Sequence, residues 1–505
     1  MIFIPITKLV NNTDKSFFVE QVQLYTKLVN AFCLKNHIEN NADDKIINLV
    51  ELKSIGVIEK EDDLKVLKTV LKSDFSPFIK SVNFAVSNKN QLDGLLDKLY
   101  NSKRAELQKD FANKKQFTLV DFFCGAGGLS LGFVEEGFNI KLANDIQDVC
   151  IETYKYNHPE IPSSKIIHGD IKEIVDNVSD YIDTDIDIVV GGPPCQGFSE
   201  ANRQRVIDDP RNKLYKYYVK AVEKIAPKFV LMENVKGMLK VADQVVEDYE
   251  NLRIKKDGNI YTYNVKYKIL NSQNFSVAQS RERLIYIAVR SDIQQEKNIT
   301  PQTIFDKIEE NCKNHKTFNL SEALKDIKPL DAPRIKNMNE IDSETCGKKV
   351  DINQFENNQN EYLKLINMGR NIPYIYNHKA RYVNDINYDI YRLLNPGDDA
   401  SDEKIIDIMP YKHRLHCFKD KYYKLYPDRP CRTITAHLRM DCHSHIHPFQ
   451  IRALTPREAA RVQSFPDDFE FAGSRGEKYK QIGNAVPPLF AEALAKSIKK
   501  NLKDL

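Results

Sequence analysis

The stretch FTLVDFFCGAGGLSLGF, residues 117–133, decides the fold. Its first seven residues form a β-rich run, and the following turn contains Gly125, Gly127 and Gly128 and opens a helix. Glycines there let a ligand approach the backbone closely, and the helix N-terminus offers unpaired N–H groups. The sequence therefore predicts a ligand-binding turn. Ser130 stands where the dinucleotide-binding fingerprint has its third glycine, so the turn matches a nicotinamide-dinucleotide site imperfectly.

Six more β-rich runs occur before residue 290, separated by segments of helix length. This alternation predicts an α/β fold with a doubly wound, mostly parallel sheet and helices on both faces, because parallel strands need long crossover connections. The runs are IKLANDI (140–146), SKIIHGDI (164–171), IDIVVGG (186–192), FVLMENV (229–235), VKYKIL (265–270) and RLIYIAV (283–289).

The segments on either side of this unit follow other patterns. Residues 1–116 contain two glycines and show helical periodicity, which predicts a helical N-terminal domain of unknown role, for packing or interaction. Within it, residues 51–71 fit a helix-turn-helix or, more readily, a packed helical pair. The boundaries that we expect are 1–116, 117–290 for a catalytic and cofactor-binding domain, 291–451 for an irregular domain, and 452–505 for a helical segment that completes the catalytic domain.

Composition excludes several classes of protein. No apolar run approaches the roughly 20 residues that a bilayer requires, and the amino terminus lacks a secretory leader, so we expect a cytoplasmic protein without a membrane partner. Nine cysteines without a CxxC pair indicate reduced thiols. Seven of the eleven histidines fall between 371 and 450, but their spacing matches no ligand pattern, so we expect no metal. A net charge of +3 is too small to indicate a nucleic-acid partner.

Two carboxylates follow the second and third predicted strands. Asp145 lies 20 residues after Gly125, where a carboxylate can accept hydrogen bonds from both ribose hydroxyls. Asp170 ends the third strand, where it can accept a hydrogen bond from an adenine amino group. Together with the glycine turn, they predict a pocket for an adenosine.

A cysteine lies in a rigid loop at the same edge of the sheet. In GGPPCQGFS, residues 191–199, two prolines fix the backbone before Cys195. The fifth strand ends at Glu233, and QSRERL, residues 279–284, adds Arg281 and Arg283. These groups suit methylation of cytosine at C5, because a thiolate that adds at C6, with a proton delivered to N3, makes C5 nucleophilic toward a methyl sulfonium.

The sequence resembles the DNA cytosine-5 methyltransferases of bacterial restriction–modification systems. The resemblance covers about 117–290 and 430–495. Its blocks occur in the family's order: DFFCGAGG (121–128), Asp145, Asp170, GGPPCQGFS, ENV (233–235), QSRERL, RALTPREAARVQSFPDDF (452–469) and YKQIGNAVPP (479–488).

The resemblance implies a Rossmann-like fold that uses S-adenosylmethionine. It implies that Phe123 stacks on the adenine, that Asn484 closes the cofactor pocket, and that Asn234 and Arg281 brace the catalytic loop. It further implies that Arg283 faces the target base and that residues 291–451 form the target-recognition domain, with Thr433 of RTIT (432–435) at a DNA phosphate.

Double-stranded DNA is the implied partner, and a cognate restriction endonuclease acting at the same site is a further one. The cytosine must be flipped out of the stack, and Gln196 and Ser199 are the residues expected to fill the vacated space. The sequence alone leaves three alternatives open: a tRNA cytosine-5 methyltransferase of the same fold, a catalytically silent DNA-binding protein and, last, a nicotinamide oxidoreductase.

Overall fold

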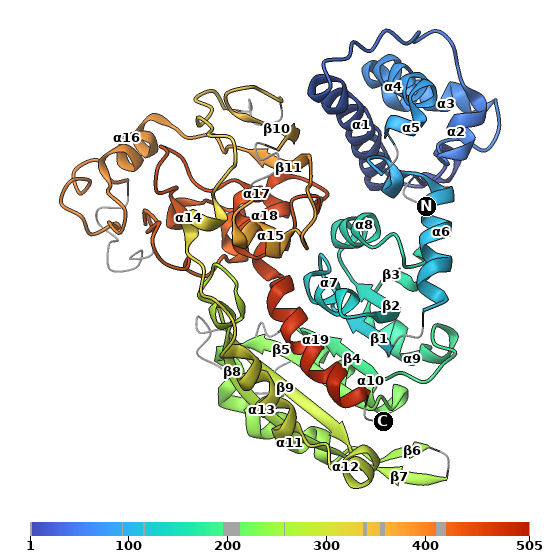
Figure 1. Ribbon diagram of the computed structural model, residues 1–505, viewed down its shortest axis with the longest axis vertical. Coiled ribbons are helices and arrows are strands. Elements are labelled where there is room, and N and C mark those ends of the chain that lie inside the picture. The colour runs from blue at the N-terminus through green and yellow to red at the C-terminus, as the bar shows by residue number, and fades with distance from the viewer. Residues whose placement is uncertain are drawn as a thin grey trace.

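The computed structural model describes residues 3–92, 94–114, 117–194, 213–256, 258–336, 341–353, 359–410 and 421–503. At its centre is a seven-stranded sheet in the order β3-β2-β1-β4-β5-β9-β8 (Figure 1). The strands are β1 (Phe117–Phe122), β2 (Phe138–Asp145), β3 (Ile166–His168), β4 (Ile188–Gly191), β5 (Phe229–Val235), β8 (Tyr263–Asn271) and β9 (Glu282–Arg290). The seven runs read from the sequence are these seven strands.

The sheet is mostly parallel, as predicted. Neighbouring strands from β3 to β5 are parallel, whereas β9 pairs antiparallel with both β5 and β8. Only ten residues, 272–281, separate β8 from β9. A parallel crossover takes a dozen or more, so this connection returns the chain antiparallel and the expectation of helix-length spacing throughout was wrong here.

Apolar side chains of the strands alternate between two buried layers. One layer contains Leu119 and Val190 and packs against α7 (Gly128–Glu135), α13 (Pro301–Cys312) and α19 (Pro488–Leu502). The other contains Val120 and Val189 and packs against α9 (Ile171–Asp176), α10 (Lys213–Ile225) and α11 (Ala242–Glu250). Helices therefore cover both faces. Near the sheet lie α8 (Asp148–Asn157), α12 (Ser291–Lys297) and the ribbon of β6 (Ile254–Lys256) and β7 (Asn259–Tyr261).

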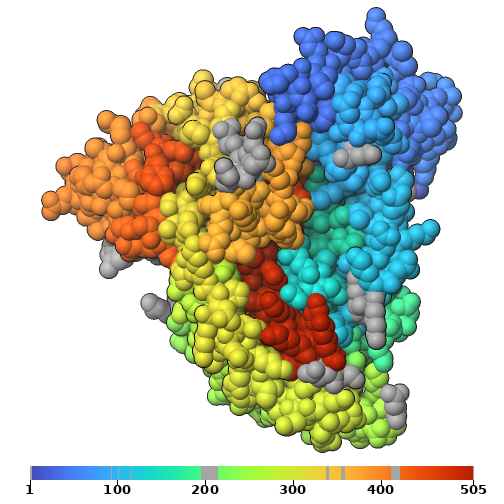
Figure 2. Space-filling view, viewed as in Figure 1, coloured from blue at the N-terminus to red at the C-terminus, as the bar shows by residue number. Residues whose placement is uncertain are grey.

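The last helix returns to the sheet from the far end of the chain. In Figure 2 the red C-terminal segment fills a groove between a cyan and a yellow segment. The red segment contains α19, which contacts α7 and α13. Gly132 permits this packing, because a side chain there would meet the backbone of α19 at Pro488 and Glu492.

The N-terminal residues form a helical unit with α1 (Asn12–Lys35), α2 (Leu49–Ser54), α3 (Asp63–Leu71), α4 (Phe75–Ser87), α5 (Lys89–Leu92) and α6 (Asn101–Ala112). The helical periodicity of this region is seen on α1, where Val22, Tyr25, Val29 and Phe32 are buried. Eight residues separate α2 from α3, more than the three or four of a helix-turn-helix, and both helices contact α4. The core of this unit also contains Val350, Tyr374 and Tyr376, so it is continuous with the next region.

That next region is built around the antiparallel pair β10 (Gly347–Ile352) and β11 (Tyr374–Lys379). Three short helices accompany it: α14 (Leu320–Ala323), α15 (Glu361–Ile366) and α16 (Asp385–Leu393). Two helices from the C-terminal part of the chain, α17 (Pro456–Val462) and α18 (Arg475–Asn484), lie among them (Figure 1).

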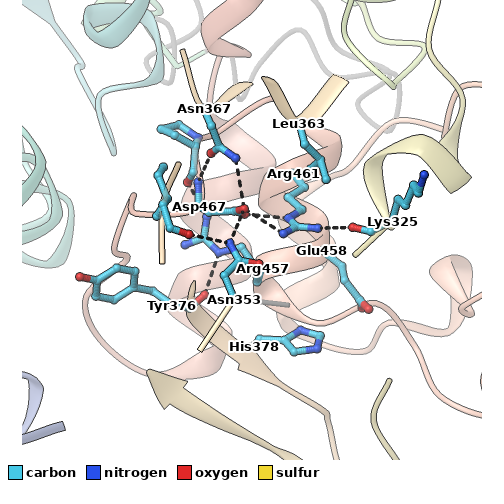
Figure 3. A network of polar contacts seen from close by, with 12 residues as sticks. Lys325, Asn353, Leu363, Asn367, Tyr376, His378, Arg457, Glu458, Arg461 and Asp467 are labelled. Carbon is cyan, nitrogen blue, oxygen red and sulfur yellow. Dashed lines mark hydrogen bonds and ion pairs between the residues drawn. The ribbon is translucent and has the colours of Figure 1, made fainter. Parts of the chain in front are cut away.

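Buried arginines hold these segments together (Figure 3). The guanidinium of Arg461 donates to both carboxylate oxygens of Asp467, at 2.7 and 2.8 Å, and to the carbonyl of Lys325. Asp467 also accepts from the amides of Asn353 and Asn367. Because both Arg461 and Asp467 are fully buried, each charge depends on the other.

The described residues contain neither a membrane span nor a metal cluster. No helix among them combines the length and hydropathy that crossing a bilayer requires. Nor does that part of the chain gather three or more His, Cys, Asp or Glu side chains in a way that would hold a metal ion.

Asp467→Asn should lower the free energy of unfolding by about 3–5 kcal/mol, because it leaves the buried Arg461 guanidinium without its counter-charge. The control is Asp389→Asn, which removes a carboxylate from an exposed pair with Arg392 and should cost less than about 1 kcal/mol. Urea denaturation measures both. Equal, small losses would show that the buried pair does not stabilise the fold as described.

Candidate active site

A pocket of about 500 Å³ lies where the parallel strands end. Residues from many distant parts of the sequence line it, including most of those singled out from the sequence. These are Phe123, Gly125, Gly128, Asp145, Asp170, Glu233, Arg281, Arg283 and Asn484. Cys195, Gln196 and Ser199 lie outside the described residues, although Pro193 and Pro194, which directly precede Cys195, line the pocket.

Asp145 shapes the glycine turn from the end of β2. One carboxylate oxygen accepts from the N–H of Gly125 at 3.0 Å, and the other accepts from the N–H of Gln147 at 2.8 Å. Burial raises the pKa of Asp145 above its ordinary value, although both backbone donors and Lys480 oppose that shift. The carboxylate therefore holds the turn open and lines the pocket at the same time.

The turn itself requires unusual backbone geometry. Phe123 lines the pocket with a φ of +58°, a left-handed conformation that is uncommon for a bulky residue and typical of functional sites. Gly127 has a φ of +91° and does not itself line the pocket. A Cβ at Gly127 would lie 2.8 Å from Nε2 of His158, so this glycine serves the packing of the turn onto α8.

Asp170 caps a helix at the rim of the pocket. Its side chain accepts from the N–H of Lys172 at 2.9 Å, which makes it the N-cap of α9. It also lines the pocket, so the expected ligand contact would come from a side chain that the cap already orients.

Glu233 and Arg283 form an ion pair inside the pocket. Nε of Arg283 lies 2.8 Å from Oε1 of Glu233, and both side chains are largely buried. Arg283 is opposite Val235 in the antiparallel pairing of β9 with β5, which puts it diagonally across from Glu233. On the other side, a Cβ at Gly192 would lie only 3.1 Å from Oε2 of Glu233, so glycine leaves space for this carboxylate.

Asn234 and Arg281, which were both expected to brace the catalytic loop, contact different segments in the structure. The Asn234 amide donates to the carbonyl of Pro193 at 3.0 Å, just before Cys195. Arg281 instead donates to the carbonyls of Ile434 and Gly483, at 2.8 and 2.9 Å. Among the described residues its guanidinium therefore fastens the RTIT segment and the end of α18 to the segment that enters β9.

Thr433 lies beside the main pocket. It lines an adjoining cavity of about 520 Å³ together with Arg283 and Val235, which both cavities share. Its hydroxyl donates to the carbonyl of Ser280 at 2.8 Å. Thr433 thus lines a space that Arg283, the partner of Glu233, also lines.

Sequence reasoning missed Asp121, which lies at the floor of the pocket. Its Oδ2 accepts from the Ser130 hydroxyl, which in turn accepts from the Tyr154 hydroxyl at 2.6 Å, while Oδ1 has no partner among the described residues. Burial raises the pKa of Asp121 to about 7, and the charge of Asp145 adds to that shift. The signal in the sequence was a single carboxylate inside the apolar run FTLVDFF.

The stability of Asp121→Asn relative to the wild type should be greater at pH 8 than at pH 5. An unfolded Asp titrates near 3.9 and the folded one at about 7, so the stability linked to this proton is complete below pH 4 and is lost as pH rises through 7. The variant lacks this loss and should gain on the order of 2 kcal/mol over the wild type between the two pH values. Thermal unfolding at both pH values measures the gain. The exposed Asp148→Asn is the control, and an equal gain there would contradict the assignment.

Comparison with known proteins agrees with this geometry. The C-5 cytosine-specific DNA methylase family matches residues 117–500. The type II methyltransferase M.DdeI of Desulfomicrobium norvegicum is 32% identical over 399 residues, which cover 75% of this chain and 88% of that protein. The type II methyltransferase M.FnuDI of Fusobacterium nucleatum is 33% identical, with 76% of this chain and 95% of the relative covered.

A solved structure shows the same fold. A protein described as a DNA modification methyltransferase encoded within an E. coli prophage superposes with a TM-score of 0.56 and 25% identity, over 77% of this chain and all of the other. Family and relatives together cover the sheet, the pocket and the returning C-terminal helices. The chain therefore belongs to the C-5 cytosine-specific DNA methylases and is a DNA cytosine-5 methyltransferase of the restriction–modification type.

Proposed function

We propose that the chain transfers a methyl group from S-adenosylmethionine to C5 of a flipped-out cytosine in double-stranded DNA, through a covalent adduct with Cys195. One observation carries the proposal. A single pocket holds Phe123 and Asp145 on one side and the Glu233–Arg283 pair on the other, with Pro194 of the PPC loop between the strands that supply them. An adenosine site and a base site therefore adjoin.

The residues present suit this methyl donor. Phe123 offers an aromatic face, Asp145 and Asp170 offer acceptors for ribose and adenine, and Gly125 leaves the backbone accessible. Oδ1 of Asp121 is a buried acceptor without a partner among the described residues, and it would suit a donor group such as an amine. When bound, S-adenosylmethionine supplies an electrophilic methyl group on a sulfonium.

On the base side, each residue has a distinct task. The Cys195 thiolate would add to C6 while Glu233 delivers a proton to N3, which makes C5 nucleophilic. The ion pair with Arg283 holds the Glu233 carboxyl in place for that contact. After the methyl group has been accepted, a base removes the proton from C5, the C6–S bond breaks with release of the Cys195 thiolate, and N3 returns its proton to Glu233.

Recognition of DNA would involve the remaining parts of the chain. We assign residues 291–451 to target recognition, residues 117–290 and 452–505 to the catalytic unit, and residues 1–116 to packing or interaction. Thr433 would contact a phosphate at the cavity beside Arg283. Gln196 and Ser199 would fill the space that the flipped cytosine leaves, which offsets an unpairing cost of a few kcal/mol. A cognate restriction endonuclease would act at the same sequence.

Transfer of labelled methyl groups from S-adenosylmethionine should occur to duplex plasmid DNA and not to tRNA. Glu233→Gln should slow transfer by about 10²–10⁴-fold, since an amide keeps the acceptor for Arg283 but cannot deliver a proton to N3. Glu247→Gln, on the exposed side of α11, is the matched control and should keep the wild-type rate. Preferred transfer to tRNA, or a Glu233→Gln enzyme at full rate, would refute the scheme.

Asp145→Ala should weaken S-adenosylmethionine binding by roughly ten- to a hundredfold, because it removes hydrogen bonds to a charged acceptor and releases the turn at Gly125. Calorimetric titration without DNA measures the affinity. Asp148→Ala removes the same charge three residues further on, from a side chain that does not line the pocket, and should bind normally. Unchanged affinity of Asp145→Ala would exclude this carboxylate from the cofactor site.

A further inference from the structure

A second cavity, of about 850 Å³, lies between the N-terminal helical unit and the rest of the chain. Its walls come from α1, the end of α3, β10, β11 and the N-terminal end of α18. Figure 1 shows α1 beside β10, and these two elements are in contact. The cavity shares no lining residue with the catalytic pocket, which is lined by the C-terminal half of α18.

The lining is strongly cationic. Six lysines and Arg475 face two carboxylates, those of Glu20 and Asp342. The cations come from every wall: Lys15 and Lys27 from α1, Lys72 from the end of α3, Lys349 and Lys379 from the two strands, and Arg475 and Lys478 from α18. Segments more than 400 residues apart in sequence therefore bring like charges together.

The two carboxylates neutralise only part of this charge. Asp342 pairs with Lys27 and, at 3.0 Å, with Lys379, while Glu20 pairs with Lys349 at 2.6 Å. Lys15, Lys72 and Arg475 form no ion pair within the described part of the chain.

Within the lining, buried cations also lie close to one another. Burial, and then repulsion from Lys349, lowers the pKa of Lys478 below its ordinary value, although Glu470 and Glu20 lie 4.0 and 3.7 Å away. Nζ of Lys478 donates to Oδ1 of Asn377 at 2.8 Å. Asn377 lines the cavity and is only 3% exposed, yet its Nδ2 has no hydrogen-bond partner among the described residues. The site thus combines excess positive charge with an unused donor.

We propose that this cavity binds a small phosphate-bearing anion and that the bound anion links the N-terminal unit to α18. The volume lies within the roughly 300–1,000 Å³ range of small-ligand pockets, which favours a free polyphosphate over a duplex. Phosphate oxygens accept charge-assisted hydrogen bonds from lysine and arginine. An anion contacting Lys15, Lys72 and Arg475 would supply the counter-charge that the described residues lack.

Calorimetric titration of the full-length protein with inorganic tripolyphosphate tests the proposal. This probe carries no adenine, so it does not mimic an adenosine ligand of the catalytic pocket. We expect binding that weakens as salt rises and that falls at least tenfold in the double variant Lys15→Glu, Arg475→Glu. Both substitutions lie in the first turn of a helix, where an acidic residue is favourable, so the fold should persist.

The matched control is the double variant Lys65→Glu, Lys364→Glu. It changes the charge equally at an exposed first-turn position of α3 and an exposed last-turn position of α15, neither of which lines the cavity, and it should bind like the wild type. Absence of binding to the wild type, or an equal loss in both double variants, would overturn the proposal. The proposal would also be overturned if tripolyphosphate did not bind the wild type while the Lys15→Glu, Arg475→Glu variant lost affinity for duplex DNA. The surface would then bind nucleic acid.

Discussion

The buried guanidinium of Arg281 is the constraint on which the pocket depends. It joins three segments that are distant in sequence, because it directly precedes β9 and donates to the carbonyls of Ile434 and Gly483. Burial, followed by repulsion from Arg283, lowers the pKa of Arg281 far below its ordinary value, while Glu233 opposes that shift. Such a costly charge is tolerated only where carbonyls and a carboxylate surround it. The same carbonyls fix the pocket wall that contains Asn484.

Neighbouring polar contacts extend this junction. The Gln279 side chain accepts from the N–H of Ile434 at 2.6 Å and donates to Gln463, whose own amide donates to the carbonyl of Ile482. Further along, Arg457 donates to the carbonyls of Tyr376, Pro466 and Phe469. Helices α17 and α18 are therefore fixed on both sides by buried hydrogen bonds, and the ends of α18 contribute to two separate cavities.

Much of the fold was predictable from the sequence because it rests on local periodicity. The runs that form β1 to β5 alternate with helix-length segments, and each run is long enough for one buried strand. The reversed direction of β9 relative to β8 follows from a ten-residue connection, which is too short for the parallel crossover that the alternation predicts. Pro487 and Pro488 mark the start of the last helix in the sequence, since proline fits the first turn.

The candidate site was predictable in composition but not in its contacts. Carboxylates at strand ends, such as Asp145 and Glu233, meet because parallel strands end at one edge of the sheet. The partners of Arg281 could not be foreseen, since Ile434 and Gly483 lie more than 150 residues away and contribute only backbone carbonyls, which every residue has. For the same reason, nothing in the helical pattern of residues 1–116 indicated that Lys15 and Arg475 would line one cavity.

Bisulfite sequencing of plasmid DNA from cells that express the chain tests the central claim most directly, because it reads the product at single-base resolution whatever the target sequence is. We expect protected cytosines at one position of one short sequence with the wild type, and none with Cys195→Ser, whose hydroxyl is scarcely ionised at neutral pH. Complete conversion of every cytosine with the wild type, or equal protection with Cys195→Ser, would contradict the proposed methylation.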